Sequence, residues 1–198
     1  MKTPNLFVMS GLPRSGKSSI AEFLSREHGF LRVGSDDIRE EYGMQWGSKD
    51  NREININRVV YYRAMEHLMM SQDVVIDTTG MFRQQRRLFF DLHVYGVGKL
   101  HRLKARKYII SVEIDDQIWL ERQKAAGRSG DDWSFYRGKF QPVSADETTQ
   151  LNGHFRFQNN TPADLEEIKR QLGIHLSRQA AEKKCIQDTH SPAFQPAS

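Results

Sequence analysis

The sequence predicts an α/β fold in which a central parallel sheet of about five strands is flanked by helices. Two observations predict this fold. Apolar, β-branched runs alternate along the chain with stretches whose apolar residues recur at helical spacing, which is typical of parallel sheets covered by helices. A glycine-rich motif also lies between the first such run and the first helical stretch. With 198 residues, the chain is long enough for one domain with a buried core.

The motif at residues 11–18 fits the pattern Gly-x-x-x-x-Gly-Lys-Ser of the phosphate-binding P-loop. A short apolar strand over residues 5–9 precedes it, and a helix that ends at Gly29 follows it. In that arrangement backbone N–H groups and the helix dipole face an anion. We expect Lys17 to reach the β- and γ-phosphates of ATP and the Ser18 hydroxyl to bind Mg²⁺. The predicted nucleotide-binding residues are Gly11, Pro13, Arg14, Ser15, Gly16, Lys17, Ser18 and Ser19.

The other strands are predicted from short apolar or β-branched runs that turn residues bound. They lie at residues 30–34, 73–78, 108–114 and 154–157. The clearest is Asp73-Val74-Val75-Ile76-Asp77-Thr78, a continuous apolar run that ends in a carboxylate. Parallel strands that are buried on both faces have this composition.

Helices are predicted between these strands, where apolar residues recur at intervals of three and four. They lie at residues 35–42, 52–71, 83–95, 116–126 and 131–140, and the segments 43–51 and 141–153 are expected to be loops. Gly96 and Gly98 are expected to end the third of these helices, and the break at residues 127–130 to end the fourth.

A last helix is predicted to begin at Thr161, because an N-cap threonine is followed by Pro162 and by acids in the first turn. The residues after about Leu176 are polar. We therefore expect one domain over residues 1–175 and a disordered tail over residues 176–198.

Composition and charge describe an ordinary globular protein, with 38% hydrophobic residues, 27% charged residues and a net charge of +4. The sequence has no apolar run of membrane-spanning length and no signal-peptide pattern at its start, and the single Cys185 suits a reducing compartment, so a cytoplasmic location is expected. Residues 83–107 contain eight cations and one acid. Such a stretch would attract nucleic acid, but it also fits a solvated surface.

Chemistry is expected at the carboxyl ends of the strands, where parallel sheets bind their ligands. Asp36 follows the second strand and is the candidate general base, which would accept the proton of an acceptor hydroxyl and could hold Mg²⁺ through water. Arg39, one helical turn further on, could clamp an acceptor phosphate. The alternative role for Asp36 and Asp37 is to cap the helix that follows.

Asp77 ends its strand like a Walker-B carboxylate directed at the metal, with capping of the next turn as the alternative. Threonines follow it, and the absence of a second acid there disfavours simple ATP hydrolysis. Arg122 and Arg128 flank the glycine break after the helix over 116–126 and are candidates for a lid that folds over the phosphates. The histidines show no metal-binding spacing.

These residues together resemble the kinase domain of phage-type polynucleotide kinases and related small P-loop kinases. The resemblance covers roughly residues 5–175 and departs from the family pattern at Arg14, where glycine is usual, and at Ser35, where arginine is usual. It depends on the P-loop, Ser35-Asp36-Asp37-Ile38-Arg39, Val75-Ile76-Asp77-Thr78-Thr79, Arg86, Asp115 to Arg122 with Arg128, and Phe140-Gln141-Pro142 with Asp146-Glu147.

The resemblance implies a P-loop kinase fold with the P-loop strand in the centre of the sheet and an arginine-bearing lid. It implies that Lys17 and Ser18 bind nucleotide and magnesium, that Asp36 is the general base and that Arg39 contacts the acceptor. It places Asp77, Thr78 and Arg86 near the acceptor, and Arg122 and Arg128 in the lid.

The function predicted from these features is ATP-dependent transfer of the γ-phosphate to a hydroxyl, most simply the 5′-hydroxyl of a polynucleotide. One alternative acceptor is the hydroxyl of a small molecule such as a nucleoside, a metabolite or an antibiotic. A further alternative is a nucleotide-binding regulatory protein with little transfer activity. The sequence does not define the oligomeric state.

Overall fold

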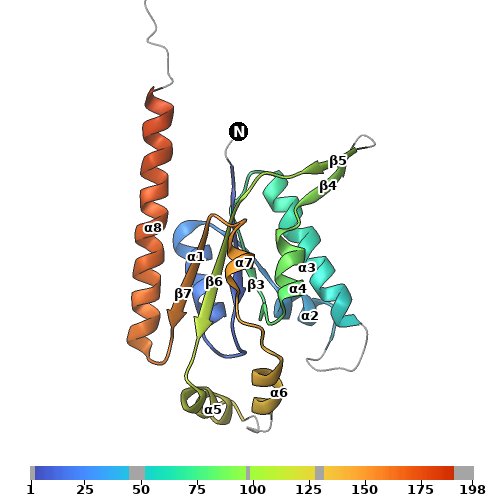
Figure 1. Cartoon of the computed structure of the whole chain (residues 1–198), viewed down its shortest axis with the longest axis vertical. Coiled ribbons are helices and arrows are strands. Elements are labelled where there is room, and N and C mark those ends of the chain that lie inside the picture. Colours follow the sequence, from blue (N-terminus) through green and yellow to red (C-terminus); the bar gives the residue numbers. More distant parts are fainter. Residues whose placement is uncertain (1–2, 45–51, 97–98, 128–131, 190–198) are drawn as a thin grey trace, which may run out of the picture.

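The centre of the fold is a sheet of five parallel strands, as the sequence predicts. A computed structural model describes residues 3–44, 52–96, 99–127 and 132–189 of the chain (Figure 1). From one edge of the sheet to the other, the strands are β2 (Leu31–Gly34), β3 (Val74–Asp77), β1 (Asn5–Ser10), β6 (Arg106–Glu113) and β7 (Gly153–Gln158). The P-loop strand β1 is central, and Val8 is in register with Ile76 on one side and Ile109 on the other.

Two layers of helices cover the two faces of the sheet. Successive side chains of a strand point to opposite faces, so each face has apolar residues that a helix layer buries. Leu6 and Val8 of β1 face α3 (Arg52–Met69) and α4 (Arg83–Phe90) in one core cluster. Phe7 and Met9 face α1 (Lys17–His28) and α8 (Pro162–Thr189) in the other. All six residues of β1 are buried, so this strand is in contact with both cores.

The remaining helices lie around the carboxyl ends of the strands or beside the sheet (Figure 1). They are α2 (Ser35–Glu41), α5 (Asp116–Ala125), α6 (Asp132–Lys139) and α7 (Ala145–Thr148). A third apolar cluster joins α5 and α6 to the P-loop and to the segment after β3; its buried members are Leu12, Met81, Ile114, Trp119 and Tyr136. This cluster holds the expected lid region against the edge of the sheet where ligands bind.

The prediction of one helix over residues 83–95 is wrong in its second half. The helix α4 ends at Phe90, and the antiparallel strands β4 (His93–Gly96) and β5 (Lys99–Arg102) follow it as a hairpin. Gly96, expected to end the helix, is the last residue of β4 and pairs with Lys99, whereas Gly98 lies outside the described residues. The segment predicted as a loop over residues 141–153 also contains α7, whose start has a capping box between Ser144 and Glu147.

The structure also differs from the disordered tail that the sequence predicts from residue 176. The helix begins at Pro162 as predicted, but it continues to Thr189, so the expected domain boundary falls inside a helix. Ile168, Leu172 and Gln179 are buried on one face of α8, and the amide of Gln179 donates to the hydroxyl of Tyr108 over 2.7 Å. This buried face stabilises a polar stretch as a helix. Residues 190–198 lie outside the described part of the chain.

In the part of the chain that the structure describes, no helix has an apolar segment long enough to cross a bilayer.

The packing of α8 predicts a difference between two neighbouring substitutions. Leu172→Ala removes a fully buried side chain and should lower the free energy of unfolding by about 2–5 kcal/mol. Ile174→Ala, on the same helix, removes a side chain that is 40% exposed and should cost less than about 1 kcal/mol. Denaturant titrations of both variants measure this, and equal losses would contradict the packing of α8.

Candidate active site

The P-loop is held in a conformation that only glycine permits at two positions. Gly11 and Gly16 have φ angles of 153° and 98°. A Cβ atom on Gly11 would lie 2.4 Å from the carbonyl oxygen of Val112, and one on Gly16 would lie 2.1 Å from the Nδ2 atom of Asn159. Arg14 has a φ of 62°, which explains why glycine is favoured at this position in the kinases that the sequence resembles.

Side chains from distant parts of the chain hold the carbonyl groups of the loop. The indole of Trp119 donates to the carbonyl of Pro13 over 2.7 Å, and the amide of Asn159 donates to the carbonyl of Ser15 over 2.7 Å. Trp119 and Asn159 are both buried. Neither was identified from the sequence, because each lies more than 100 positions from its partner and no local pattern marks it.

The N-terminus of α1 is available for an anion. Its N-cap residue is Gly16, and no side chain forms a hydrogen bond that caps it. The first N–H groups of a helix have no partner within the helix, and the helix dipole favours negative charge at this end. This is the arrangement that the sequence predicts for the phosphates.

Lys17 is buried in the loop and lacks a full set of partners. Its Nζ atom donates to the carbonyl of Leu12 over 2.6 Å. Burial lowers the pKa of Lys17 to about 8, and the nearby carboxylates of Asp77 and Asp36 offset only part of that effect. An anion placed here would therefore restore the charged form of the ammonium group.

Ser18 and Asp77 lie together, as expected for a magnesium site. The Ser18 hydroxyl donates to Oδ1 of Asp77 over 3.3 Å. Hydroxyl and carboxylate oxygens suit Mg²⁺, which usually keeps several waters and also binds phosphate oxygens. No group of three or more His, Cys, Asp or Glu side chains suited to a metal occurs among the described residues.

Arg32 is a further member of the site that the sequence did not reveal. From β2, its Nε and Nη2 atoms donate to Oδ2 of Asp77 over 2.9 and 2.7 Å, and its Nη1 atom donates to Asp37 over 2.9 Å. Asp77 is 6% exposed, so this fork supplies the positive charge that a buried carboxylate requires. It also keeps Oδ1 of Asp77 directed at Ser18.

The two aspartates that follow β2 have different partners, since Asp37 accepts from Arg32 and Asp36 pairs with Arg39. The N-cap residue of α2 is Gly34 and no side chain caps this helix, so the capping alternative does not describe Asp36 or Asp37. Asp36 forms an ion pair with Arg39 and has a side chain that is 75% exposed, whereas Arg39 is largely buried. Asp36 is thus a solvent-accessible carboxylate close enough to Lys17 to affect its pKa.

Two predicted acceptor residues have other roles. Arg86 is fully buried, and its guanidinium donates to Glu147, to the Gly80 carbonyl over 2.7 Å and to the Gln141 carbonyl over 2.8 Å. Although burial alone would raise it, the pKa of Glu147 is lowered by this contact. Thr78 is also buried and accepts from the N–H of Gly80 over 3.2 Å. These two side chains shape the turn after β3, and their partners leave Arg86 no donor for a substrate.

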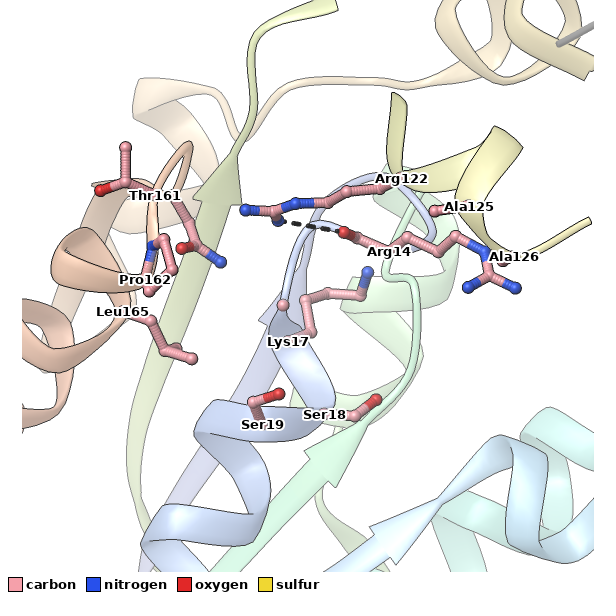
Figure 2. A pocket seen from close by; sticks show the side chains of 12 residues that line it. Arg14, Lys17, Ser18, Ser19, Arg122, Ala125, Ala126, Thr161, Pro162 and Leu165 are labelled. Atoms are coloured by element: carbon pink, nitrogen blue, oxygen red, sulfur yellow. Dashed lines mark hydrogen bonds between the residues drawn. The ribbon is translucent and has the colours of Figure 1, made fainter. Parts of the chain in front are cut away.

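The two candidate lid arginines differ in what the structure describes. Arg122 donates to the carbonyl of Arg14 over 3.3 Å and to that of Asn160 over 3.2 Å, which places its guanidinium over the P-loop (Figure 2). Arg128 lies outside the described residues, so its place in the lid stays a prediction.

A pocket of about 610 Å³ extends from the P-loop to the neighbouring helices. Lys17, Ser18 and Arg122 are among its polar lining residues. Apolar side chains flank it, and Figure 2 shows them on both sides of the P-loop: Ala125 and Ala126 from the end of α5, and Pro162 and Leu165 from the start of α8. A pocket with cations at the P-loop and apolar flanks suits the phosphates and the base of a nucleotide.

Part of the positive charge of the basic stretch over residues 83–107 is buried or paired. Arg86 and Lys107 are buried, and Arg83 forms an ion pair with Asp146. Arg87 and Arg102 are exposed. The local charge excess seen in the sequence is therefore partly neutralised inside the fold.

Comparison with known proteins identifies the family. Residues 6–139 match a family model described as an AAA domain, and the chain belongs to that family. Its architecture is that of the P-loop kinase fold, with a five-stranded parallel sheet flanked by helices. A putative kinase from Chloroflexus aurantiacus has a solved structure that is 18% identical, with a TM-score of 0.66 over 90% of this chain and 98% of its own. A gluconokinase from Sinorhizobium meliloti is also 18% identical, with a TM-score of 0.55 over 94% and 99% of the two chains.

Two further similarities cover less of the chains that are compared. The adenylate kinase of Prochlorococcus marinus is 26% identical over 176 residues, which cover 80% of this chain and 87% of that enzyme. The structure of a Pnkp1/Rnl/Hen1 complex matches with 20% identity and a TM-score of 0.50, over 62% of this chain and 40% of the other.

The lowered pKa of Lys17 predicts that ATP binding takes up a proton. Above pH 8 the ammonium group is partly neutral in the free protein, and phosphates favour its charged form, so binding raises its pKa. Near pH 9 we expect an uptake of about half to one proton per ATP bound. Calorimetry in buffers of different ionisation enthalpy measures it. Lys17→Arg, which stays protonated, should remove the uptake, and an unchanged uptake in this variant would contradict the assignment.

Proposed function

We propose that this P-loop kinase transfers the γ-phosphate of ATP, bound with Mg²⁺, to a hydroxyl group of a small molecule. The observation that supports the proposal most directly is the exposed carboxylate of Asp36, which does not cap a helix and whose charge acts on the pKa of the buried Lys17. A general base for an acceptor must be open to that acceptor and close to the phosphate site.

The donor side uses the P-loop and its surroundings. Lys17 and the N-terminus of α1 would bind the phosphates, and Arg122 would neutralise charge that develops during transfer. When bound, Mg²⁺ would neutralise the phosphate oxygens, and Ser18 and Asp77 are the residues that would hold it, Asp77 in part through water. One of the apolar flanks of the pocket would receive the adenine base.

The acceptor side uses the end of β2. Asp36 would accept the proton of the acceptor hydroxyl while that oxygen forms a bond to the γ-phosphorus and the bond to ADP breaks. Arg39 keeps the Asp36 carboxylate oriented through their ion pair and could also contact an anionic group of the acceptor. With threonines at positions 78 and 79, the end of β3 offers no second acid beside Asp77 to activate water, which favours transfer over hydrolysis.

Two findings favour a small acceptor over the polynucleotide that the sequence suggests. The stretch over residues 83–107 loses part of its charge to buried and paired side chains, so it is a weaker platform for a polyanion than the sequence indicates. In addition, the gluconokinase superposes over almost its entire length, whereas the complex that contains Pnkp1 matches over less than half of its chain.

Transfer of label from γ-labelled ATP to a panel of sugars, nucleosides and a 5′-hydroxyl oligonucleotide tests the proposal. We expect label on a small acceptor and none on the oligonucleotide. Label on the oligonucleotide alone would contradict the proposal in favour of a polynucleotide kinase. ATP binding without a labelled product in any arm would favour a nucleotide-binding regulatory protein.

Asp36→Asn should lower kcat by about 10²–10⁴ with the affinity for ATP nearly unchanged, because it removes only the base. The matched control is Asp37→Asn, which changes the neighbouring carboxylate and should cost much less. Equal effects of the two substitutions would contradict the assignment of Asp36 as the base.

A further inference from the structure

A second pocket lies away from the P-loop, on the face of the sheet that α4 covers. It has a volume of about 390 Å³ and lies between the end of α4, the base of the β4–β5 hairpin and the segment around α7 (Figure 1). The charged residues that line it are Arg87, Arg102, Lys107, Asp91, Asp146 and Glu147. None of these residues belongs to the nucleotide pocket.

The three carboxylates of this pocket already have partners. Asp146 forms an ion pair with Arg83, and Glu147 forms one with Arg86 at 2.6 Å. Asp91 is in contact with Nδ1 of His93 at 2.5 Å. Counting Arg83 and Arg86, five cations are grouped here with three carboxylates.

The three cations that line the pocket have no carboxylate of their own. Arg87 and Arg102 are exposed, and neither forms an ion pair with any residue in the described ranges. Lys107 is 7% exposed, and its Nζ atom donates to the carbonyl of Phe90 over 2.5 Å, which leaves two of its three donors.

The electrostatics of Lys107 indicate that the cations crowd one another. Burial lowers its pKa, the charge of Arg102 lowers it further, and Asp91 offsets only part of this effect. A bound anion would relieve this repulsion and would supply the acceptors that these donors lack. Arginine side chains are suited to such a ligand, because a guanidinium can bind a phosphate through two parallel hydrogen bonds.

We propose that this pocket is a binding site for the phosphate group of a small phosphorylated metabolite, separate from the sites for ATP and for the acceptor. Arg87, Arg102 and Lys107 are its cationic ligands. The volume of the pocket suits a molecule of that class and is within the usual range for small-molecule sites.

The site is connected to the active site through buried contacts. Glu147 lines the pocket and binds Arg86, and Arg86 donates to the Gly80 carbonyl, in the turn after β3, and to the Gln141 carbonyl, just after α6. A ligand held beside Glu147 would therefore be linked to the turn that follows Asp77 through two side chains, Glu147 and Arg86. This connection makes the pocket suited to an effector of the kinase rather than to a second reaction.

The test measures binding of fructose 1,6-bisphosphate and of inorganic phosphate by calorimetry, with saturating Mg·ADP present so that the P-loop is occupied. We expect saturable binding to the wild-type protein, weakened by about tenfold or more in Arg87→Gln and in Arg102→Gln, each of which loses charge-assisted hydrogen bonds. Lys104→Gln is the matched control, since Lys104 is an exposed cation nearby that does not line the pocket.

Two results would overturn the proposal. One is the absence of saturable binding of both probes, or binding that neither arginine substitution weakens more than Lys104→Gln does. The other comes from repeating the titration with a single-stranded oligonucleotide. If Arg87 and Arg102 affect the binding of the oligonucleotide but not of the two phosphate probes, this surface is a nucleic-acid contact. Far-UV circular dichroism of the variants checks that all of them are folded.

Discussion

The close approach of the P-loop to strands β6 and β7 is the constraint on which the rest of the site depends. The carbonyl of Val112 and the amide of Asn159 occupy the space where side chains at residues 11 and 16 would begin. With glycine at both positions, the loop can turn tightly into α1, and Asn159 and Trp119 fix it by binding its carbonyl groups. The uncapped start of α1 and the ammonium of Lys17 then face the same pocket. The site for the phosphates is therefore built before any ligand arrives, so that little conformational entropy is lost on binding.

Around this loop, the charge of each buried group is partly compensated by a neighbouring group of opposite charge. Arg32 neutralises Asp77, and Asp77 in turn favours the charged form of Lys17, which burial disfavours. A nucleotide with its magnesium would complete both balances, since its phosphates suit Lys17 and its metal suits Ser18 and Asp77. Asp36 differs from these residues because its side chain is exposed and forms an ion pair with Arg39. In the proposed reaction, this difference would give a preorganised donor side and an acceptor side that is open to a second substrate.

The sequence predicted those features that depend on local patterns. The five strands, the P-loop and the start of α8 at Pro162 all follow from residue spacing, and the structure confirms them. Features that depend on distant contacts were missed: Asn159 and Trp119 at the P-loop, and Arg32 beside Asp77. Arg86 was assigned to the acceptor because a sequence does not show that Glu147, 61 residues away, would bury its charge. The hairpin after α4 and the C-terminal part of α8 were missed for the same reason, since packing rather than local preference determines both.

The affinity of Gly16→Ala for ATP tests whether the tight turn of the P-loop builds the phosphate site, with Gly29→Ala as its control. Both glycines have a positive φ, but a Cβ atom on Gly29 would meet nothing within 4 Å, whereas one on Gly16 would strike Asn159. Both variants should lose some stability, because a side chain is strained at a positive φ. We predict that Gly29→Ala binds ATP like the wild type and that Gly16→Ala binds it about tenfold more weakly or worse, from about 1–3 kcal/mol of strain in the loop. Wild-type affinity in a folded Gly16→Ala protein would show that the phosphate site does not depend on glycine at this position.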